Sequence, residues 1–352
     1  MLGSHNVFAE RLLRWYDAHR RDLPWRIPAG PHGRPDPYHV LVSELMLQQT
    51  QVAPVVPYFH RFLARFPTLA DLAAAPEQDV LRLWQGLGYY SRARNLQRAA
   101  QRAVADHGGT VPGDVTSLLA LPGVGRYTAG AVASIAFGVR APIVDGNVIR
   151  VLCRLDKVET DPRTDRATQD LLWRRAEEVL PAGRVGDFNS ALMELGATVC
   201  TPRNPQCLIC PVREHCAAQA AGVQETIPPP KKAKPTPTEK RVVVCVRRAG
   251  RWLIEQRPAT GRWAGMWQFF AREAGPRGAL APPVPASRPK RIGKVEHQLT
   301  HRRYEFDVKW CEATGDEPAD LDRPHAWEPL DGLAAYPMSK PHLTIAGMLR
   351  DL

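Results

Sequence analysis

The sequence predicts a mainly α-helical N-terminal region followed by a smaller α+β domain. Three observations lead to this prediction. Apolar residues recur at helical spacing through the first 226 residues, a proline- and lysine-rich stretch follows at 227–240, and the apolar pattern then changes to that of strands. The chain has 352 residues, of which 44% are hydrophobic and 24% charged, which is enough to fill two packed cores.

The helical prediction rests on apolar stripes such as Phe8, Leu12, Trp15 and Tyr16, with further stripes around 41–47 and 171–180. Between stripes, Thr68 with Asp71 has the pattern of a capping box. The prolines of 227–240 exclude a helix or a central strand, so we expect an extended linker there. After it, 242–246 is an apolar β-branched run, 304–310 alternates apolar and polar residues as a half-buried strand does, and 274–289 is a loop.

The charge balance points to a polyanionic partner. Lys and Arg number 47 against 36 Asp and Glu, a formal net charge of +11. This favours nucleic acid ahead of an anionic membrane, because no stretch approaches the roughly 20 apolar residues of a spanning helix. Since the first residues lack the pattern of a signal peptide, we expect a cytoplasmic protein, associated with the nucleoid through DNA, whose cysteines stay reduced.

Four cysteines lie close together, as Cys200-x6-Cys207-x2-Cys210-x5-Cys216. Four thiolates at such spacing can converge on one metal centre. Zinc sites usually show two Cys-x2-Cys pairs, and only one is present here, so the spacing favours a cubane iron–sulfur cluster while zinc stays open. Arg203 lies inside this loop and is a natural contact for a phosphate. The other three cysteines, at 153, 245 and 311, have apolar neighbours and are expected in the core.

A glycine-containing turn, Leu121-Pro-Gly-Val-Gly-Arg126, precedes a run of small residues that resembles a close-packed helix. The backbone amides of Gly123, Val124, Gly125 and Arg126 would lie at that helix's N-terminus, where they suit a DNA phosphate. A plain connection between two helices explains the glycine pattern equally well.

Two acidic residues stand out. Glu44 lies in an apolar helical stretch, where burial raises the pKa of a carboxyl and makes it a plausible general acid; a solvated glutamate beside the core explains the pattern equally well. Asp145 precedes an amphipathic helix, and taken alone it is best interpreted as an N-cap.

These features together resemble the helix-hairpin-helix DNA glycosylases that carry an iron–sulfur cluster, and among them the MutY-type adenine DNA glycosylases. The segment 43–51 is similar to the catalytic-helix motif of that branch, 21–26 to its entry motif and 86–94 to its wedge loop. Tyr127 occupies the position that is lysine in the endonuclease-III-type lyases. Because a tyrosine cannot form a Schiff base with the sugar, the resemblance implies a monofunctional glycosylase.

The resemblance implies removal of adenine mispaired with 8-oxoguanine or guanine in double-stranded DNA, by a monomer that carries a [4Fe-4S] cluster and flips the nucleotide out. Glu44 would protonate adenine, Asp145 would stabilise the cationic sugar, Tyr127 would hydrogen-bond the acidic pair, and Asn147 would orient Asp145 or the water. The backbone amides at the Asp145 helix should keep that carboxylate ionised, while Glu44 stays protonated. The remaining implied residues are an adenine pocket of Arg21, Trp25 and Leu47, DNA wedge and backbone contacts at Gln49, Tyr89, Gly123, Val124, Gly125, Arg126 and Arg203, and the four cysteines as cluster ligands.

The resemblance divides the chain into a helical glycosylase region at 1–226, with a six-helix module at about 28–140 and a cluster module from about 1–27 plus 141–226. A Nudix-like domain follows at 241–352, in which 261–269 is similar to the Gly-x-x-Gly-x-Trp segment. The acidic box that binds magnesium in Nudix hydrolases is not visible, so nucleotide hydrolysis is not expected there. Leu299, Thr300 and His301 would read 8-oxoguanine. Residues 27–37 are rich in proline and glycine and are expected as a surface loop.

Two other functions stay open. One is an endonuclease-III-type glycosylase and lyase that acts on oxidised pyrimidines, against which Tyr127 argues. The other is a non-catalytic DNA-binding protein in which the four cysteines hold structural zinc.

Overall fold

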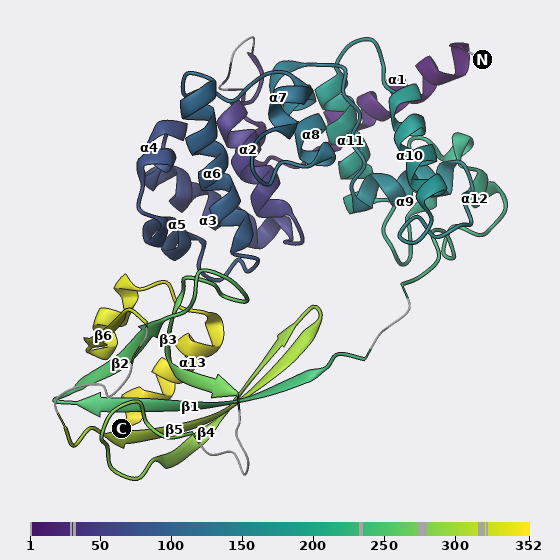
Figure 1. The fold of residues 1–352 in the computed structure, drawn as a ribbon. Coiled ribbons are helices and arrows are strands. Elements are labelled where there is room, and N and C mark those ends of the chain that lie inside the picture. Colours follow the sequence, from purple (N-terminus) through teal and green to yellow (C-terminus); the bar gives the residue numbers. More distant parts are fainter. Residues whose placement is uncertain are drawn as a thin grey trace. The chain divides into compact units, whose positions relative to one another are not determined.

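The computed structural model of the chain describes residues 2–28, 30, 33–231, 235–273, 280–315, 321 and 323–352. Contacts along the backbone divide it into two units: a helical unit of Met1–Ala74 and Asn95–Lys232, and a second unit of Ala75–Arg94 and Ala233–Leu352. Both are drawn in Figure 1. The division groups residues 75–94 with the C-terminal part of the chain, which no local pattern in the sequence indicated.

The helical unit contains short and medium helices, with one isolated β-bridge between Pro28 and Pro35 among its described residues. The helices are α1 (Leu2–His19), η1 (Pro24–Arg26), α2 (Pro37–Leu47), α3 (Val52–Arg65), α4 (Leu69–Ala74), α7 (Val115–Leu119), α8 (Arg126–Phe137), α9 (Gly146–Leu155), α10 (Arg166–Glu178), α11 (Val185–Thr198), η3 (Cys207–Ile209), η4 (Arg213–His215) and α12 (Ala217–Ala220). Helix α6 (Ser91–Asp106) runs from the second unit into this one. The predicted helical fold is confirmed, and in the described part of the chain no helix is long and apolar enough to cross a bilayer.

Side-chain caps set where the helices begin. Asp36 caps α2, because its carboxylate accepts hydrogen bonds from the backbone amides of Tyr38 and His39 at 2.8 and 3.0 Å. The capping box is confirmed: Thr68 Oγ1 accepts from the amide of Asp71, and the Asp71 carboxylate accepts from the amide of Thr68, both at 3.1 Å. The Asp36 cap fixes the start of α2, which carries Glu44, and the capping box fixes the start of α4.

Helices α1, α9 and α11 share one core, to which each contributes fully buried side chains such as Leu12, Leu152 and Phe188. Gly196 on α11 lies directly against Asn147 on α9. A Cβ at residue 196 would come within 2.6 Å of the Asn147 Cβ, so only glycine permits this close approach of the two helices. The approach positions Asn147 and its neighbour Asp145.

The predicted surface loop at 27–37 is described in part, since Ala29, Pro31 and His32 lie outside the described residues. The amide of Gly30 donates to the carbonyl of Arg34 at 2.7 Å. Arg34 donates from Nη1 to the carbonyl of Phe137 at 2.8 Å, which ties the loop to the end of α8.

The second unit contains a six-stranded sheet of order β4-β5-β1-β3-β2-β6. The elements are α5 (Glu77–Trp84), β1 (Thr238–Arg248), β2 (Arg251–Gln256), β3 (Trp267–Glu273), β4 (Lys290–Leu299), β5 (Arg302–Glu312), β6 (His325–Glu328), η6 (Leu330–Ala335), α13 (Lys340–Met348) and η7 (Leu349–Asp351). Strands β1 and β5 are parallel, and every other neighbouring pair is antiparallel. The predicted strands at 242–246 and 304–310 are confirmed within β1 and β5. Of the predicted loop at 274–289, residues 274–279 lie outside the described residues.

The predicted end of the linker at 240 is wrong. Strand β1 begins at Thr238, which pairs with Arg303 of β5. The last proline of the stretch is Pro237, and beyond it every residue has a backbone amide that the strand ladder can use. Residues 238–240 have the extended backbone that was predicted, and their pairing depends on β5, which lies far along the sequence.

Candidate active site

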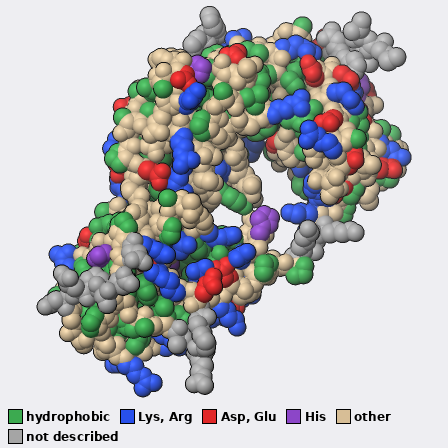
Figure 2. Space-filling model, viewed as in Figure 1, with side chains coloured by type: hydrophobic (Ala, Val, Ile, Leu, Met, Phe, Trp, Pro, Cys, Tyr) green, Lys and Arg blue, Asp and Glu red, His purple; other side chains and the backbone are tan. Residues whose placement is uncertain are grey.

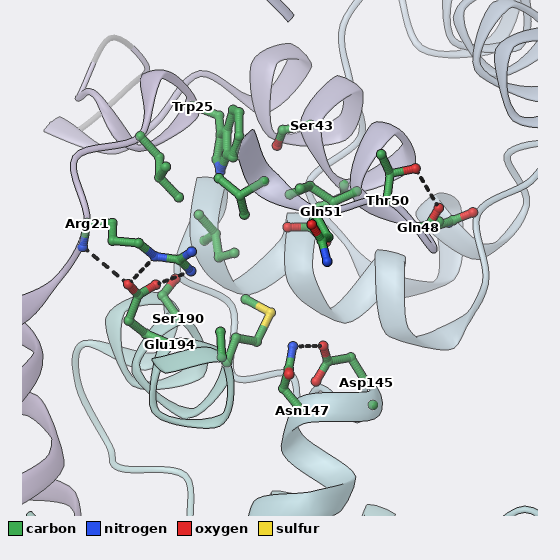
Figure 3. Close-up of a pocket in the computed structure, with 18 of the residues that line it drawn as sticks. Arg21, Trp25, Ser43, Gln48, Thr50, Gln51, Asp145, Asn147, Ser190 and Glu194 are labelled. Carbon is green, nitrogen blue, oxygen red and sulfur yellow. Dashed lines mark hydrogen bonds and ion pairs between the residues drawn. The ribbon is translucent and has the colours of Figure 1, made fainter. Parts of the chain in front are cut away.

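A cavity of about 940 Å³ opens in the helical unit among α2, α8, α9 and α11. Figure 3 shows Arg21, Trp25, Asp145 and Asn147 around it. It brings together residues that lie far apart in the sequence and that the sequence analysis singled out: Arg21, Trp25, Glu44, Leu47, Gln49, Tyr127, Asp145 and Asn147. The two carboxyl groups therefore line one cavity.

Glu44 enters the cavity from α2 and is only 5% exposed. The hydroxyl of Tyr127 donates a hydrogen bond to Glu44 Oε2 at 2.6 Å. Burial raises the pKa of Glu44 to about 7 and the charge of Asp145 contributes, although the Tyr127 hydrogen bond and the charge of Arg26 act against the rise. Near neutral pH this carboxyl can hold a proton and release it.

Asp145 caps α9, because its Oδ1 accepts from the amide of Val148 at 2.7 Å. Its Oδ2 accepts from Asn147 Nδ2 at 3.0 Å. Burial raises the pKa of Asp145, and these hydrogen bonds reduce the rise without reversing it. Burial therefore outweighs the helix amides in setting the pKa of Asp145, and the ionised state expected for this carboxyl stays a prediction.

Arg150, one turn further along α9, connects this carboxylate to the cysteine loop. Its Nη2 donates to Asn147 Oδ1 at 2.9 Å and to the carbonyl of Gly196 at 2.7 Å, and its Nε donates to the carbonyl of Cys200 at 2.6 Å. Asn147 is thus held on both sides, by Asp145 and by Arg150. Arg150 could not be predicted as a site residue, since an arginine on an amphipathic helix has no distinct sequence pattern.

At the other end of the cavity, Arg21 is held by Glu194 of α11. Arg21 donates from Nε to Oε1 at 2.6 Å and from Nη2 to Oε2 at 3.1 Å, and Arg26 adds a bond to Oε2 at 2.8 Å. The Glu194 side chain is fully buried, and the two guanidinium groups lower its pKa although burial alone would raise it. Figure 3 shows Arg21 and Glu194 facing one another.

The cavity is also lined by Glu194, Arg26, Ser190 and Met193, none of which is among the site residues predicted from the sequence. A usable signal existed for Glu194: it is a carboxylate within the otherwise apolar run Ala191–Leu195, the same signal that singled out Glu44. The sulfur atom of Met193 lies 3.1 Å from the hydroxyl oxygen of Tyr127 and accepts a hydrogen bond from it.

The residues expected at DNA have unusual backbone geometry. Gly123 has a φ of 78°, and a Cβ there would come within 2.5 Å of the Asn95 Cβ, so glycine is required in the turn between α7 and α8. Gly125 is the N-cap of α8, Val124 is buried, and Arg126 lies with its guanidinium carbon 3.9 Å from the centre of the Trp173 ring. The expected wedge residues Gln49 and Tyr89 have φ values of 57° and 48°, in the left-handed region.

The four cysteines line one small cavity together with the buried Arg154. Arg154 Nη1 lies 3.3 Å from Cys200 Sγ and also donates to the carbonyl of Thr201 at 2.7 Å. Four cysteine sulfur atoms around a common space, with a cation beside one of them, fit the ligand set of an iron–sulfur cluster. Arg203 is exposed on the same loop.

In the second unit, a cavity of about 550 Å³ includes Tyr89 and the β4–β5 hairpin with Leu299, Thr300 and His301. The hydroxyl groups of Tyr89 and Thr300 share a hydrogen bond of 2.7 Å. Leu299 pairs with Arg302 across the hairpin, so Thr300 and His301 form its exposed two-residue turn. The expected reading residues therefore lie beside one expected wedge residue.

Comparison with known families matches three stretches of the chain. Residues 42–178 match the HhH-GPD superfamily base excision DNA repair protein, residues 200–216 the iron–sulfur binding domain of endonuclease III, and residues 241–347 the NUDIX domain. The match to the iron–sulfur binding domain begins at Cys200, ends at Cys216 and includes Cys207 and Cys210. The chain therefore carries a [4Fe-4S] cluster site, and the zinc interpretation is not supported.

Two solved structures that resemble part of the chain are enzymes that act on DNA. A thermostable thymine-DNA glycosylase is 32% identical with a TM-score of 0.55, and covers 62% of this chain and 97% of its own. A trapped endonuclease III–DNA covalent intermediate is 25% identical with a TM-score of 0.52, and covers 63% of this chain and 98% of its own.

Adenine DNA glycosylases from several organisms are similar over nearly the whole chain. The human enzyme is 39% identical in an alignment that covers 91% of this chain and 69% of the human enzyme. The rat enzyme is also 39% identical, and its alignment covers 93% of this chain and 75% of the rat enzyme. These matches, together with the helix-hairpin-helix, iron–sulfur and Nudix segments, show that the chain is a DNA glycosylase of base excision repair and belongs to the adenine DNA glycosylase family.

Proposed function

We propose that the chain excises adenine paired with 8-oxoguanine or guanine in double-stranded DNA, by acid-catalysed hydrolysis of the N-glycosidic bond. The observation that carries this proposal is one cavity lined by two carboxyl groups, Glu44 with a pKa of about 7 and Asp145 fixed at the start of α9. A proton donor and a second acid on one cavity are what the reaction needs.

In the proposed reaction the adenosine is flipped out of the duplex and enters the cavity. Glu44 gives its proton to N7 of adenine, which makes the base a better leaving group, and the C1′–N9 bond breaks. The sugar becomes an oxocarbenium-like cation that Asp145 stabilises through its negative charge, and water then adds to C1′ with loss of a proton. Asn147 orients Asp145 through its hydrogen bond to Oδ2.

The proposed adenine pocket consists of Arg21, Trp25 and Leu47. Glu194 holds the Arg21 guanidinium through two hydrogen bonds, and the ring of Trp25 packs edge-on against Phe59 with centroids 5.3 Å apart. Rigid support of this kind keeps the recognising groups in one geometry. Tyr127 replaces the lysine of the lyases, so we propose excision without strand cleavage by the enzyme.

The proposed partner is duplex DNA, bound by a monomer in the cytoplasm. A solved endonuclease III relative is a complex with DNA, and the backbone amides of 123–126 together with Arg203 are the proposed phosphate contacts. Many Lys and Arg side chains lie on the face drawn in Figure 2. Tyr89 and Gln49 are the proposed wedges, and Leu299, Thr300 and His301 the proposed readers of 8-oxoguanine.

The [4Fe-4S] cluster would be held by Cys200, Cys207, Cys210 and Cys216. When bound it supplies a rigid centre that ties the loop to α9, where Arg150 and Arg154 contact Cys200. The acid and base steps belong to the side chains of the 940 Å³ cavity alone.

Single-turnover excision tests the proposal, with alkali treatment to reveal abasic sites. Duplexes with A:8-oxoguanine, A:G and an oxidised pyrimidine are compared in parallel. We expect cleavage of the two adenine duplexes by the wild type, loss of cleavage in Glu44→Gln, and no covalent adduct with borohydride. Cleavage of the oxidised pyrimidine with borohydride trapping would support a glycosylase and lyase instead.

A further inference from the structure

A second cavity of the C-terminal unit has a chemistry that base excision does not use. It measures about 310 Å³ and lies among the start of β1, the segment between β2 and β3, and the start of β5. Ligand pockets begin at roughly this size, near 300 Å³. Its lining combines cations and aromatic rings: Arg241, Arg257, Arg262, Arg302, Trp263 and Tyr304.

The carboxylates of this cavity neutralise only part of its positive charge. Glu239 accepts hydrogen bonds from Arg241 and, at 2.6 Å, from Arg302. Glu273 lies 3.6 Å from Arg241 and is itself largely exposed. Four arginines against these two glutamates leave a net charge of +2 on the lining.

The uncompensated charge lies on Arg257 and Arg262. Within the described part of the chain, neither forms an ion pair with a carboxylate. Arg257 donates instead to neutral oxygens, to Gln268 Oε1 at 2.5 Å and to the backbone carbonyl of Arg262 at 3.0 Å. Burial and the nearby charges of Arg241 and Arg323 lower the pKa of Arg257, although the charge of Glu255 acts against this change. A bound anion would relieve this repulsion between like charges.

Arg302 adds an unsatisfied donor. Among the described residues its Nε is one of the few buried side-chain nitrogens without a hydrogen-bond partner. Because buried polar groups normally have partners in folded proteins, the hydrogen bonding of this cavity-lining guanidinium is incomplete in the absence of a ligand.

Two aromatic side chains complete the cavity. The rings of Trp263 and Tyr304 lie 5.1 Å apart at 50°, with Arg257 over the first ring at 5.8 Å and Arg262 over the second at 5.4 Å. Trp263 has a φ of 51°, a left-handed conformation that is unusual for tryptophan and is held by its surroundings. Aromatic faces beside cations bind nucleobases next to their phosphates.

We propose that this cavity is a nucleotide site, in which a phosphate group binds Arg257, Arg262 and Arg302 and the attached base packs against Trp263 and Tyr304. The nucleotide comes either from free nucleoside monophosphate or from a DNA strand. The site is distinct from the cavity of Tyr89 and Thr300, with which it shares only Arg262 and Trp263 as lining residues. It involves binding alone and does not depend on the excision reaction.

Calorimetric titration of the full chain with its cluster tests the free-nucleotide source. We expect deoxyguanosine monophosphate to bind, and inorganic phosphate and deoxyguanosine to bind at least about tenfold more weakly, because each provides only half of the contacts. Arg257→Gln and Arg302→Gln should each weaken binding of the monophosphate at least about tenfold. The matched control is Arg291→Gln, because Arg291 is an exposed arginine on β4 that pairs with Asp307. This variant should change the affinity for the monophosphate by less than about twofold.

Fluorescence anisotropy with an undamaged duplex over a series of salt concentrations tests the DNA source. If a strand supplies the phosphate, Arg257→Gln lowers the salt slope by about one, and Arg291→Gln does so by less. The proposal is overturned if Arg257→Gln and Arg291→Gln have the same affinity for the monophosphate and also the same salt slope. Thermal melting by circular dichroism checks folding, and if Arg257→Gln does not fold, the comparison between Arg302→Gln and Arg291→Gln decides.

Discussion

Arg150 donates a hydrogen bond of 2.6 Å from its Nε to the carbonyl oxygen of Cys200, the first cysteine of the cluster loop. The same guanidinium reaches Asn147 Oδ1 at 2.9 Å, and Asn147 reaches Asp145 Oδ2 at 3.0 Å. The proposed charge-stabilising carboxylate is therefore connected, through Asn147 and Arg150, to the loop that carries the cluster ligands. This gives the cluster a structural route to the chemistry without any transfer of electrons.

Replacing Arg150 by lysine should separate these contacts. Lysine keeps the charge, but its single ammonium group cannot reach Asn147, Gly196 and Cys200 together. We expect single-turnover excision to slow by about tenfold to a hundredfold, with iron and labile sulfide per chain unchanged. Arg175→Lys on α10, where an arginine pairs with Asp156 at 2.9 Å, is the control. Wild-type excision by Arg150→Lys would mean that the bond from Arg150 does not orient Asp145.

The proposed acid predicts a pH dependence. Because excision requires protonated Glu44, whose pKa is about 7, the single-turnover rate should fall as the pH rises through about 7. Below pH 7, Glu44→Gln should be slower by about a thousandfold or more, since the amide has no proton to give, and this difference should shrink at higher pH as the wild-type rate falls. A wild-type rate that stays level from pH 6 to pH 9, roughly two units beyond that pKa, would assign the acid to another group.

The same group predicts how stability depends on pH. The pKa of Glu44 is raised in the folded state from 4.5 to about 7, so the folded chain binds the extra proton between these values. Stability linked to Glu44 is thus fully present below the unfolded pKa and is lost as the pH rises through the folded one. Above it, Glu44→Gln should be more stable than the wild type by up to about 3 kcal/mol, and the difference should vanish in acid. Urea unfolding of the wild type and of Glu44→Gln, once below the unfolded pKa and once above the folded pKa, measures this difference in the free energy of unfolding. A difference of equal size in the two conditions would contradict the prediction.

The sequence predicts those features that local patterns determine. The helices, their caps and the strands of 242–246 and 304–310 follow from apolar period and turn chemistry. Glu44 can be found as a carboxylate in an apolar helix, and the cysteines can be found by their spacing. Each of these signals lies within about twenty residues of chain.

The remaining features depend on packing between distant segments. Arg21 meets Glu194 173 positions away, and Tyr89 meets Thr300 across 211 positions. The pKa of Asp145 rises because neighbouring helices exclude water from it, although the local amide bond acts in the other direction. No local pattern shows how closely two helices approach, so such relationships appear only in the folded structure.

Glu194 is expected to position Arg21 and to stabilise the unit. Its pKa is lowered by two guanidinium groups, so this stabilisation is present above the unfolded pKa of about 4.5 and is lost as the pH falls through the folded value. Glu194→Ala leaves two arginines without their shared partner and should cost about 2 kcal/mol, a figure kept low because Arg21 is partly exposed. It should also weaken binding of adenine-containing duplex more than that of a duplex with an abasic analogue. An equal loss for both would show that Glu194 supports the fold without serving the pocket.

Tyr127 has one hydroxyl proton and two acceptors, Glu44 Oε2 at 2.6 Å and Met193 Sδ at 3.1 Å. When Glu44 is ionised, the proton points to its carboxylate. When Glu44 is protonated, the acid can donate to the tyrosine oxygen, and the tyrosine proton can turn to the sulfur, a weak acceptor. Met193 thereby favours the protonated state of Glu44 that excision needs. The charged groups facing Glu44 in this state are Asp145 on α9 and Arg26 on η1.

Met193→Leu keeps the shape of the side chain and removes the acceptor. The excision rate should then fall at a lower pH than in the wild type, by a few tenths of a unit, as expected for loss of a weak hydrogen bond. In Tyr127→Phe the excision rate should fall at a higher pH than in the wild type, because the hydrogen bond from Tyr127 lowers the pKa of Glu44. In the Tyr127→Phe background, Met193→Leu should leave the pH profile unchanged, since no hydroxyl remains to turn. If the two shifts simply add, Met193 acts on packing alone and the sulfur takes no part in the proton's position.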